Sequence, residues 1–203
     1  MKLLVLGGTG PTGALVIDQA LAAGDTVRAL VRSPEKVGAS NPNLEVVTGQ
    51  ATEPADVTSA LDGIDAVIVT LGATKGSVIT DATRALLAGA AQHPVARVVV
   101  LSSFAVLRDR LSAPAKLMSG MAMGATVKDK ASGEQLLRES GLNYTLVYAT
   151  RLTNAAATGG ATAVADGETL RLGHTVSRAD VAAFLLAQAR DTNTAQRAVT
   201  ITG

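Results

Sequence analysis

The feature that most constrains the fold of this chain is a glycine-rich turn near its beginning, Gly7-Gly8-Thr9-Gly10-Pro11-Thr12-Gly13. The turn contains the pattern G-x-G-x-x-G, directly follows the apolar run 3–6, and directly precedes a helical segment at 12–23. In this context the glycines permit a tight turn and a close approach of the backbone to a pyrophosphate, which the helix N-terminus then binds. Pro11 has no N–H, but it suits the first helical turn, where that donor would lack an intrahelical partner. The pattern therefore predicts a dinucleotide-binding turn rather than a bare connection between strand and helix.

Short apolar runs alternate with alanine-rich helical segments along the whole chain. We predict strands at residues 3–6, 26–31, 44–47, 66–71, 97–101, 144–147 and 198–201, and helices at 12–23, 54–61, 80–92, 127–140 and 178–190. Several strand candidates are continuously apolar, which is typical of strands covered on both faces. Alternating strands and helices imply a parallel sheet with right-handed crossovers. We therefore predict one α/β domain over residues 1–203, a doubly wound parallel sheet of the Rossmann type.

Composition excludes several classes of protein. A net charge of +1 gives no reason to expect nucleic acid or an anionic membrane as a partner. The absence of cysteine excludes disulfides, thiol catalysis and thiolate metal sites, and His93 and His174 lie too far apart in sequence to suggest a metal site. The first apolar run breaks at Gly7, too early for a signal peptide, and no run is long enough for a membrane span. We expect a cytoplasmic monomer or weak homodimer that acts on a small molecule.

The residues after the second predicted strand bear on the choice of cofactor. An NAD-specific domain usually carries Asp or Glu there, whereas this chain reads Val31-Arg32-Ser33-Pro34-Glu35-Lys36. Arg32 can present a planar fork to a 2′-phosphate, and Lys36 can add a point charge. The alternative is that Arg32 is a solvated residue of a surface loop. The segment favours NADP(H) over NAD(H).

The least regular stretch of the chain is 107–126, which carries Met118, Met121 and Met123 together with Gly120 and Gly124. It follows the fifth predicted strand, so it leaves the sheet at the carboxyl edge, where doubly wound folds bind ligands. One interpretation is a mobile substrate lid whose thioethers pack on a flat substrate. The other is an ordinary loop that covers a helix.

Motifs along the whole chain resemble the atypical short-chain dehydrogenase/reductases, and most closely the biliverdin reductase B / flavin reductase type. They are the glycine turn, Leu30-Val31-Arg32, Asp65-Ala66-Val67-Ile68-Val69, Leu71-Gly72, Leu101-Ser102-Ser103, Leu137-Arg138-Glu139-Ser140-Gly141-Leu142-Asn143-Tyr144 and Ser177-Arg178-Ala179-Asp180-Val181. The resemblance implies that Gly7 to Gly13 bind the pyrophosphate and that Arg32, Ser33 and Lys36 bind the 2′-phosphate. It places Gln50, where the family normally has Asp, and Ala51 beside the adenine. It implies further that Leu71-Gly72-Ala73 line the cofactor, and that Ser102 and Ser103 lie beside the nicotinamide.

The substrate side departs from the wider superfamily, which uses a Tyr-x-x-x-Lys pair as its proton donor. Lys130 stands at the lysine position, but Thr126 stands four residues earlier. The flavin reductase type also lacks the pair. At its two histidine positions this chain carries Lys130 and Arg151, which puts biliverdin in doubt and suggests an anionic or electron-rich acceptor. The candidate catalytic residues are therefore Ser103, Lys130 and Arg151.

Three functions remain open from the sequence. The leading hypothesis is an NADPH-dependent reductase of flavins, quinones or similar conjugated acceptors. A non-catalytic NADPH-sensing protein is the second. A nucleotide-sugar epimerase or ketone reductase is disfavoured, because both reactions need the acid/base group that is missing here.

Overall fold

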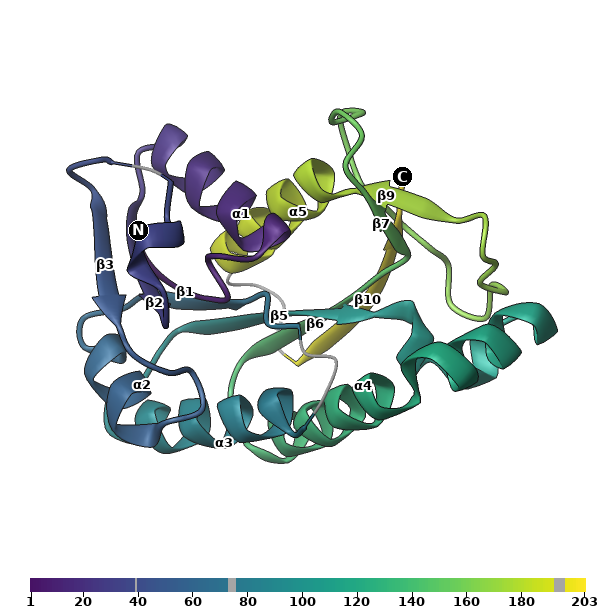
Figure 1. Ribbon diagram of the computed structural model, residues 1–203, viewed down its shortest axis with the longest axis horizontal. Coiled ribbons are helices and arrows are strands. Elements are labelled where there is room, and N and C mark those ends of the chain that lie inside the picture. The colour runs from purple at the N-terminus through teal and green to yellow at the C-terminus, as the bar shows by residue number, and fades with distance from the viewer. Residues whose placement is uncertain (39, 73–75, 192–195) are drawn as a thin grey trace.

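A computed structural model describes residues 1–38, 40–72, 76–191 and 196–203, with the backbone alone at 119–123. Its centre is a sheet in the order β3-β2-β1-β4-β5-β6-β10-β8 (Figure 1). The strands of this sheet are β1 (Lys2–Leu6), β2 (Thr26–Val31), β3 (Leu44–Thr48), β4 (Ala66–Val69), β5 (Arg97–Ser103), β6 (Tyr144–Ala149), β8 (Thr162–Ala163) and β10 (Arg197–Thr202). All neighbours pair in parallel except β8, which pairs antiparallel to β10. The prediction of a doubly wound, mostly parallel sheet is confirmed.

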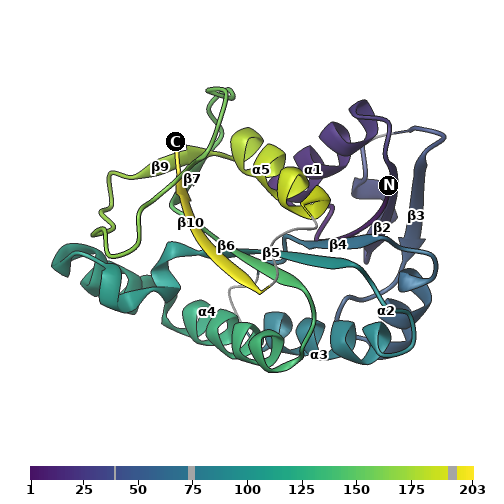
Figure 2. The same ribbon diagram turned by 180° about the vertical axis from the view of Figure 1, so that it is seen from behind.

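Helices cover both faces of the sheet. Figures 1 and 2 show α1 (Pro11–Ala22) and α5 (Arg178–Arg190) side by side on one face, and α2 (Pro54–Leu61), α3 (Val78–Ala90) and α4 (Ala113–Glu139) on the other. Alternate residues of each central strand enter the two layers, as Val147 and Leu146 of β6 do. Burial on both faces explains why these strands are continuously apolar.

The largest departure from the predicted elements concerns α4, which begins at Ala113 rather than at residue 127. Gly120 and Gly124 lower helix propensity and made this stretch look irregular. However, Pro114 occupies the first turn, where proline is tolerated, and the following Lys and Leu residues are good helix formers. Residues 113–126 of the predicted lid are therefore the start of a long helix, which extends beyond the sheet in Figure 1. Whether it moves as a lid stays a prediction.

A small lobe joins this end of α4 to the last part of the chain. Arg110 lies in a 3-10 turn, Arg108–Arg110, and donates to the carbonyl of Ala165 at 2.8 Å and to the hydroxyl of Thr200 at 3.1 Å. The N–H of Leu170 donates in return to the carbonyl of Arg110 at 2.8 Å. Two further short strands, β7 (Arg151–Thr153) and β9 (Thr175–Ser177), pair in parallel nearby. At three residues each they carry too little sequence pattern to be predicted.

Candidate functional site

The glycine turn connects β1 to α1 and is folded tightly on itself. Gly7 has a φ of 96°, in the left-handed region that favours glycine, and the N–H of Gly10 donates to its carbonyl at 3.0 Å. A Cβ atom added at Gly13 would lie 2.2 Å from the same Gly7 oxygen, a clash with backbone that no rotamer change can relieve. Gly13 therefore allows α1 to pack directly against the turn. The tight turn predicted from the sequence is present in the structure.

The N-terminus of α1 supplies donors at this turn. Ala14 is the first residue whose N–H bonds back to the turn, at 2.9 Å from the Gly10 oxygen. The N–H groups of Thr12 and Gly13 precede it and so lack an intrahelical acceptor. Together with the positive end of the helix dipole, they form a site suited to a phosphate.

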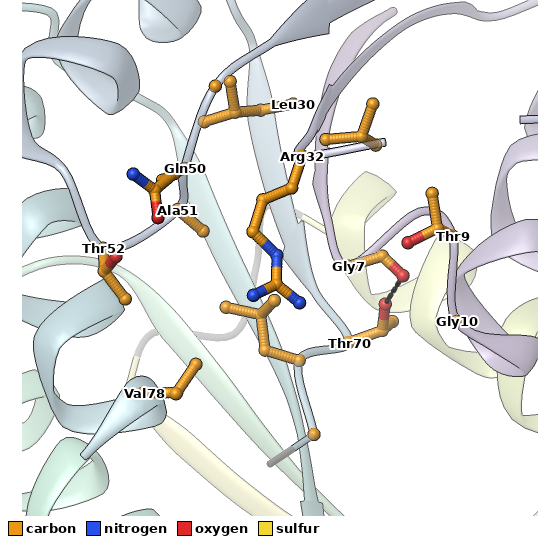
Figure 3. Close-up of a pocket in the computed structure, with 14 residues that line it drawn as sticks. Gly7, Thr9, Gly10, Leu30, Arg32, Gln50, Ala51, Thr52, Thr70 and Val78 are labelled. Atoms are coloured by element: carbon orange, nitrogen blue, oxygen red, sulfur yellow. Dashed lines mark hydrogen bonds between the residues drawn. The ribbon is translucent and has the colours of Figure 1, made fainter. Parts of the chain in front are cut away.

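A cleft of about 360 Å³ opens beside the turn at the carboxyl ends of the strands (Figure 3). Its walls are Gly7, Thr9, Gly10, Leu30, Val31, Arg32, Gly49, Gln50, Ala51, Thr52, Thr70, Leu71, Gly72 and Val78. Figure 3 shows the exposed Arg32 side chain reaching across this cleft, between Gln50 on one side and Thr70 on the other. The guanidinium is therefore available to a ligand in the cleft.

Two walls of the cleft are held by side chains that the sequence analysis did not single out. Asp56, in the first turn of α2, accepts the N–H of Gln50 at 2.8 Å and so fixes the loop after β3. Thr70, directly after β4, donates to the carbonyl of Gly7 at 3.2 Å, the bond drawn in Figure 3. A polar residue at the carboxyl end of a predicted central strand was the signal that could have identified Thr70.

The predicted cofactor residues do not all line the cleft. Those that line the cleft are Gly7, Thr9, Gly10, Arg32, Gln50, Ala51, Leu71 and Gly72. Gly8, Pro11, Thr12 and Gly13 belong to the turn and the helix start behind it, while Ser33 and the exposed Lys36 lie beyond Arg32 at a 3-10 turn, Pro34–Lys36. Ala73 lies outside the described residues, and Ser102 does not line the cleft.

Ser102 instead belongs to a buried polar cluster on the α4 side of the sheet. Its hydroxyl donates to Oε1 of Glu134 at 2.5 Å, and the Tyr148 hydroxyl donates to Oε2 of Glu134 at 2.6 Å. Arg138 donates to the Tyr148 oxygen at 2.8 Å. Glu134 is only 6% exposed and Tyr148 only 2%. The cluster therefore joins the carboxyl ends of β5 and β6 to one face of α4.

Lys130 lies at the edge of this cluster, one helical turn before Glu134. Its Nζ donates to the carbonyl of Leu101 in β5 at 3.2 Å. Burial lowers the pKa of the Lys130 ammonium, while the negative charges of Glu134 and Asp129 act in the opposite direction. Sequence analysis named Lys130 but missed Glu134, although an acid four residues after a lysine on a helix was a visible signal.

The other two candidate catalytic residues lie apart from this cluster. Ser103 ends β5 one residue after Ser102, and its Oγ accepts the N–H of Ala105 at 3.3 Å. Since successive strand residues face opposite ways, its side chain is directed away from the side of Ser102. Arg151 is exposed at the start of β7. Lys130 thus reaches the backbone of β5 two residues before Ser103, whereas Arg151 belongs to β7.

The cluster borders the cleft through the beginning of α3. Val78 lines the cleft, and the next residue, Ile79, lines a small cavity of about 10 Å³ together with Ser102, Lys130 and Glu134. Asp129 fixes this helix end by accepting the N–H groups of Ile79 at 2.9 Å and Thr80 at 3.0 Å. A carboxylate from α4 therefore caps α3 where the helix meets the cleft.

Comparison with known proteins places this chain in a family. The NAD(P)H-binding family model matches residues 7–192, and the chain belongs to that family. An uncharacterised chloroplast protein of Arabidopsis thaliana is 32% identical over 173 residues, which cover 78% of this chain and 61% of that protein. The chain thus spans less than two thirds of that relative. An uncharacterised sugar epimerase of Bacillus subtilis (strain 168), YhfK, is 29% identical over all of this chain and 94% of its own length.

A solved structure agrees with the family assignment. The anaerobilin reductase ChuY from Escherichia coli O157:H7 superposes with a TM-score of 0.82 at 26% identity, covering 100% of this chain and 97% of that one. These findings confirm the predicted fold and family, an NAD(P)H-binding protein on a Rossmann domain. No helix in the described part of the chain is long and apolar enough to cross a membrane.

Proposed function

We propose that this protein is an NADPH-dependent reductase that transfers a hydride to a conjugated acceptor such as a flavin or a quinone. The observation that carries the proposal is the burial of both of the chain's 2 tyrosines. Tyr144 and Tyr148 are both buried in β6. Burial, and then the charge of Glu134, raise the pKa of Tyr148, whose hydroxyl already donates its hydrogen bond to that carboxylate. Neither tyrosine is suited to act as the proton donor of a ketone reductase.

The shape of the cleft supports NADPH as the reductant. The glycine turn and the first N–H groups of α1 would hold the pyrophosphate, and the backbone contact at Gly13 leaves the turn room for no larger residue. Arg32 would pair with a 2′-phosphate, with the exposed Lys36 adding positive charge. Gln50 and Ala51 would flank the adenine, and a carboxamide can hydrogen-bond it. When bound, the reduced nicotinamide supplies the hydride.

The class of acceptor follows from the groups near the end of β5. Reduction of a simple ketone builds charge on an alkoxide, for which a positioned acid is typically worth about 10²- to 10⁴-fold. A flavin or quinone spreads the incoming electrons over a conjugated system, and its reduced anion can take a proton from water. The protein then needs only to hold the acceptor flat and to offer positive charge. We assign these roles to Lys130 and Arg151, with Ser103 as a hydrogen-bond partner.

The comparisons bear on the reaction type. The solved relative from Escherichia coli is an anaerobilin reductase, which supports a reductase here. The Bacillus subtilis relative is called a sugar epimerase, but epimerisation requires an acid/base group, and neither tyrosine of this chain is placed to supply one.

The test is NADPH oxidation measured against a panel of flavins, quinones and aliphatic ketones. We expect turnover of flavins or quinones to exceed that of simple ketones by orders of magnitude. Efficient reduction of aliphatic ketones would mean that an unrecognised acid is present and that this mechanism is wrong. Tight NADPH binding with no oxidation by any acceptor would instead favour a non-catalytic NADPH-sensing protein.

A further inference from the structure

The buried cluster under β5 has a defined direction of hydrogen bonding. Arg138 can only donate, so the Tyr148 oxygen accepts a hydrogen bond from it, and the Tyr148 hydroxyl donates one to Glu134. Ser102 contacts the other oxygen of the same carboxylate. Each oxygen of Glu134 therefore accepts a hydrogen bond from a hydroxyl group.

Two cations of α4 lie near the carboxylate of Glu134: Arg138, one turn later, forms an ion pair with it at 4.0 Å, and Lys130 lies on its other side. Lys130 lies one turn earlier, which brings the two side chains to the same face of α4. Both reach the last residues of β5, because Lys130 bonds to the carbonyl of Leu101 and Glu134 accepts from the neighbouring Ser102. The pair thus fixes the strand end that carries Ser103. Within the pair, Glu134 places a buried negative charge near the partly buried ammonium of Lys130.

We infer that Glu134 is a positioning residue of the acceptor site, which keeps Lys130 cationic and directed at the end of β5. The groups that face Lys130 account for this assignment. From α4 the charged groups are Glu134 and Asp129, whose carboxylate is occupied by the N-terminus of α3. From α3 the small cavity receives only Ile79 and Thr83, which are uncharged, and from β5 it receives Ser102. Of the two carboxylates that act on Lys130, Glu134 is therefore the one that does not cap a helix.

The consequence for pH follows from the sign of each effect. Burial lowers the pKa of Lys130, and Glu134 partly restores it. The cation is present below that pKa and is lost as pH rises through it. Removing the negative charge of Glu134 moves this loss to lower pH. If Lys130 assists turnover, as the proposed function states, the alkaline fall of kcat/KM moves in the same direction.

The experiment compares Glu134→Gln, which keeps the shape but removes the charge, with Tyr148→Phe, which removes one donor but keeps the carboxylate. Lys130 reactivity is measured in the unliganded protein by competitive acylation with acetic anhydride across a pH series, followed by peptide mass spectrometry. This readout does not depend on catalysis. The second readout is the pH profile of kcat/KM for NADPH with a flavin acceptor.

We expect the midpoint of Lys130 acylation and the alkaline limb of kcat/KM both to move to lower pH in Glu134→Gln, and to stay near the unmodified values in Tyr148→Phe. Glu134→Asp, which retains the charge, should restore the midpoint toward that of the unmodified protein, and it provides the test should the Gln variant fail to fold. An unchanged midpoint in Glu134→Gln, or equal shifts in Glu134→Gln and Tyr148→Phe, would overturn the inference. If only Glu134→Asp folds, a midpoint of Lys130 acylation well below that of the unmodified protein would also overturn the inference. A shifted acylation midpoint in a protein that reduces no acceptor would support the role of Glu134 and refute the proposed function.

Discussion

The charge reversal Arg32→Glu tests the choice of cofactor most directly. The side chain of Arg32 is exposed and reaches into the cleft from the end of β2, so its replacement changes the charge of the cleft without disturbing the core. A hydrogen bond to a charged group contributes about 1.5–3 kcal/mol, which corresponds to roughly 10- to 150-fold in affinity. Repulsion between the new carboxylate and a 2′-phosphate adds to this loss. The affinity for NADPH should therefore fall by roughly 10- to 150-fold or more, whereas the affinity for NADH should change little.

The assay is isothermal titration of each variant with NADPH and with NADH at two salt concentrations. Exposed charges are screened over a Debye length of about 10 Å at 0.1 M salt, so the preference for NADPH in the unmodified protein should shrink as salt is raised. Lys128→Glu makes the same change of net charge on an exposed position of α4 and serves as the control. Equal affinities for the two cofactors in the unmodified protein, or equal losses for both in Arg32→Glu, would refute the reasoning.

Four other outcomes are expected. Gly13→Ala should lower the free energy of unfolding by about 1–3 kcal/mol in urea titration and weaken NADPH binding, whereas Gly160→Ala, where an added Cβ meets nothing within 4 Å, should do neither. Lys130→Ala should lower turnover moderately rather than abolish it, because no obligatory proton step passes through it; complete loss in steady-state kinetics would contradict this. Residues 107–126 should exchange amide hydrogens fast in the free protein and more slowly in the ternary complex, and slow exchange in both states would mean a rigid segment. Hydrogen bonds from the Thr158 N–H and the Ser177 hydroxyl lower the pKa of Asp180. The stabilisation of the fold by ionised Asp180 is therefore present above the usual aspartate pKa of about 3.9 and is lost as pH falls through the lowered pKa. The difference in free energy of unfolding between the unmodified protein and Asp180→Asn should accordingly narrow in acid denaturation experiments.

The fold could be predicted from the sequence because its signals are local and agree with one another. Continuous apolar runs identified the central strands, and the glycine turn identified the first crossover. The start of α4 could not be predicted, since Gly120 and Gly124 weaken the helical pattern over a stretch where the helix extends past the sheet. There the helix is held by contacts far along the chain, such as the packing of Ala115 with Val164 and Leu170. Sequence proximity carries no information about such contacts.

The candidate site was predictable to the extent that it depends on the turn and on strand ends. Gly7, Arg32 and Gln50 were placed in one cleft because parallel strands end at the same edge of a sheet. Asp56 was missed because its role is to accept a backbone N–H, which any exposed acid near a helix start could do. The position of Ser102 depends on a carboxylate 32 residues later in the chain. Only the folded chain brings Ser102 and Glu134 together.

The contact between Gly13 and the Gly7 carbonyl divides the cleft into a part that can be redesigned and a part that cannot. A side chain added at Gly13 would collide with backbone, so any sequence that keeps this strand–helix junction keeps glycine at this position. Arg32 lines the other side of the cleft, with Ser33 and Lys36 beyond it, and these exposed or half-exposed side chains can be exchanged without repacking the core. An engineer who wishes to change the cofactor preference should therefore work after β2 and leave the turn after β1 untouched.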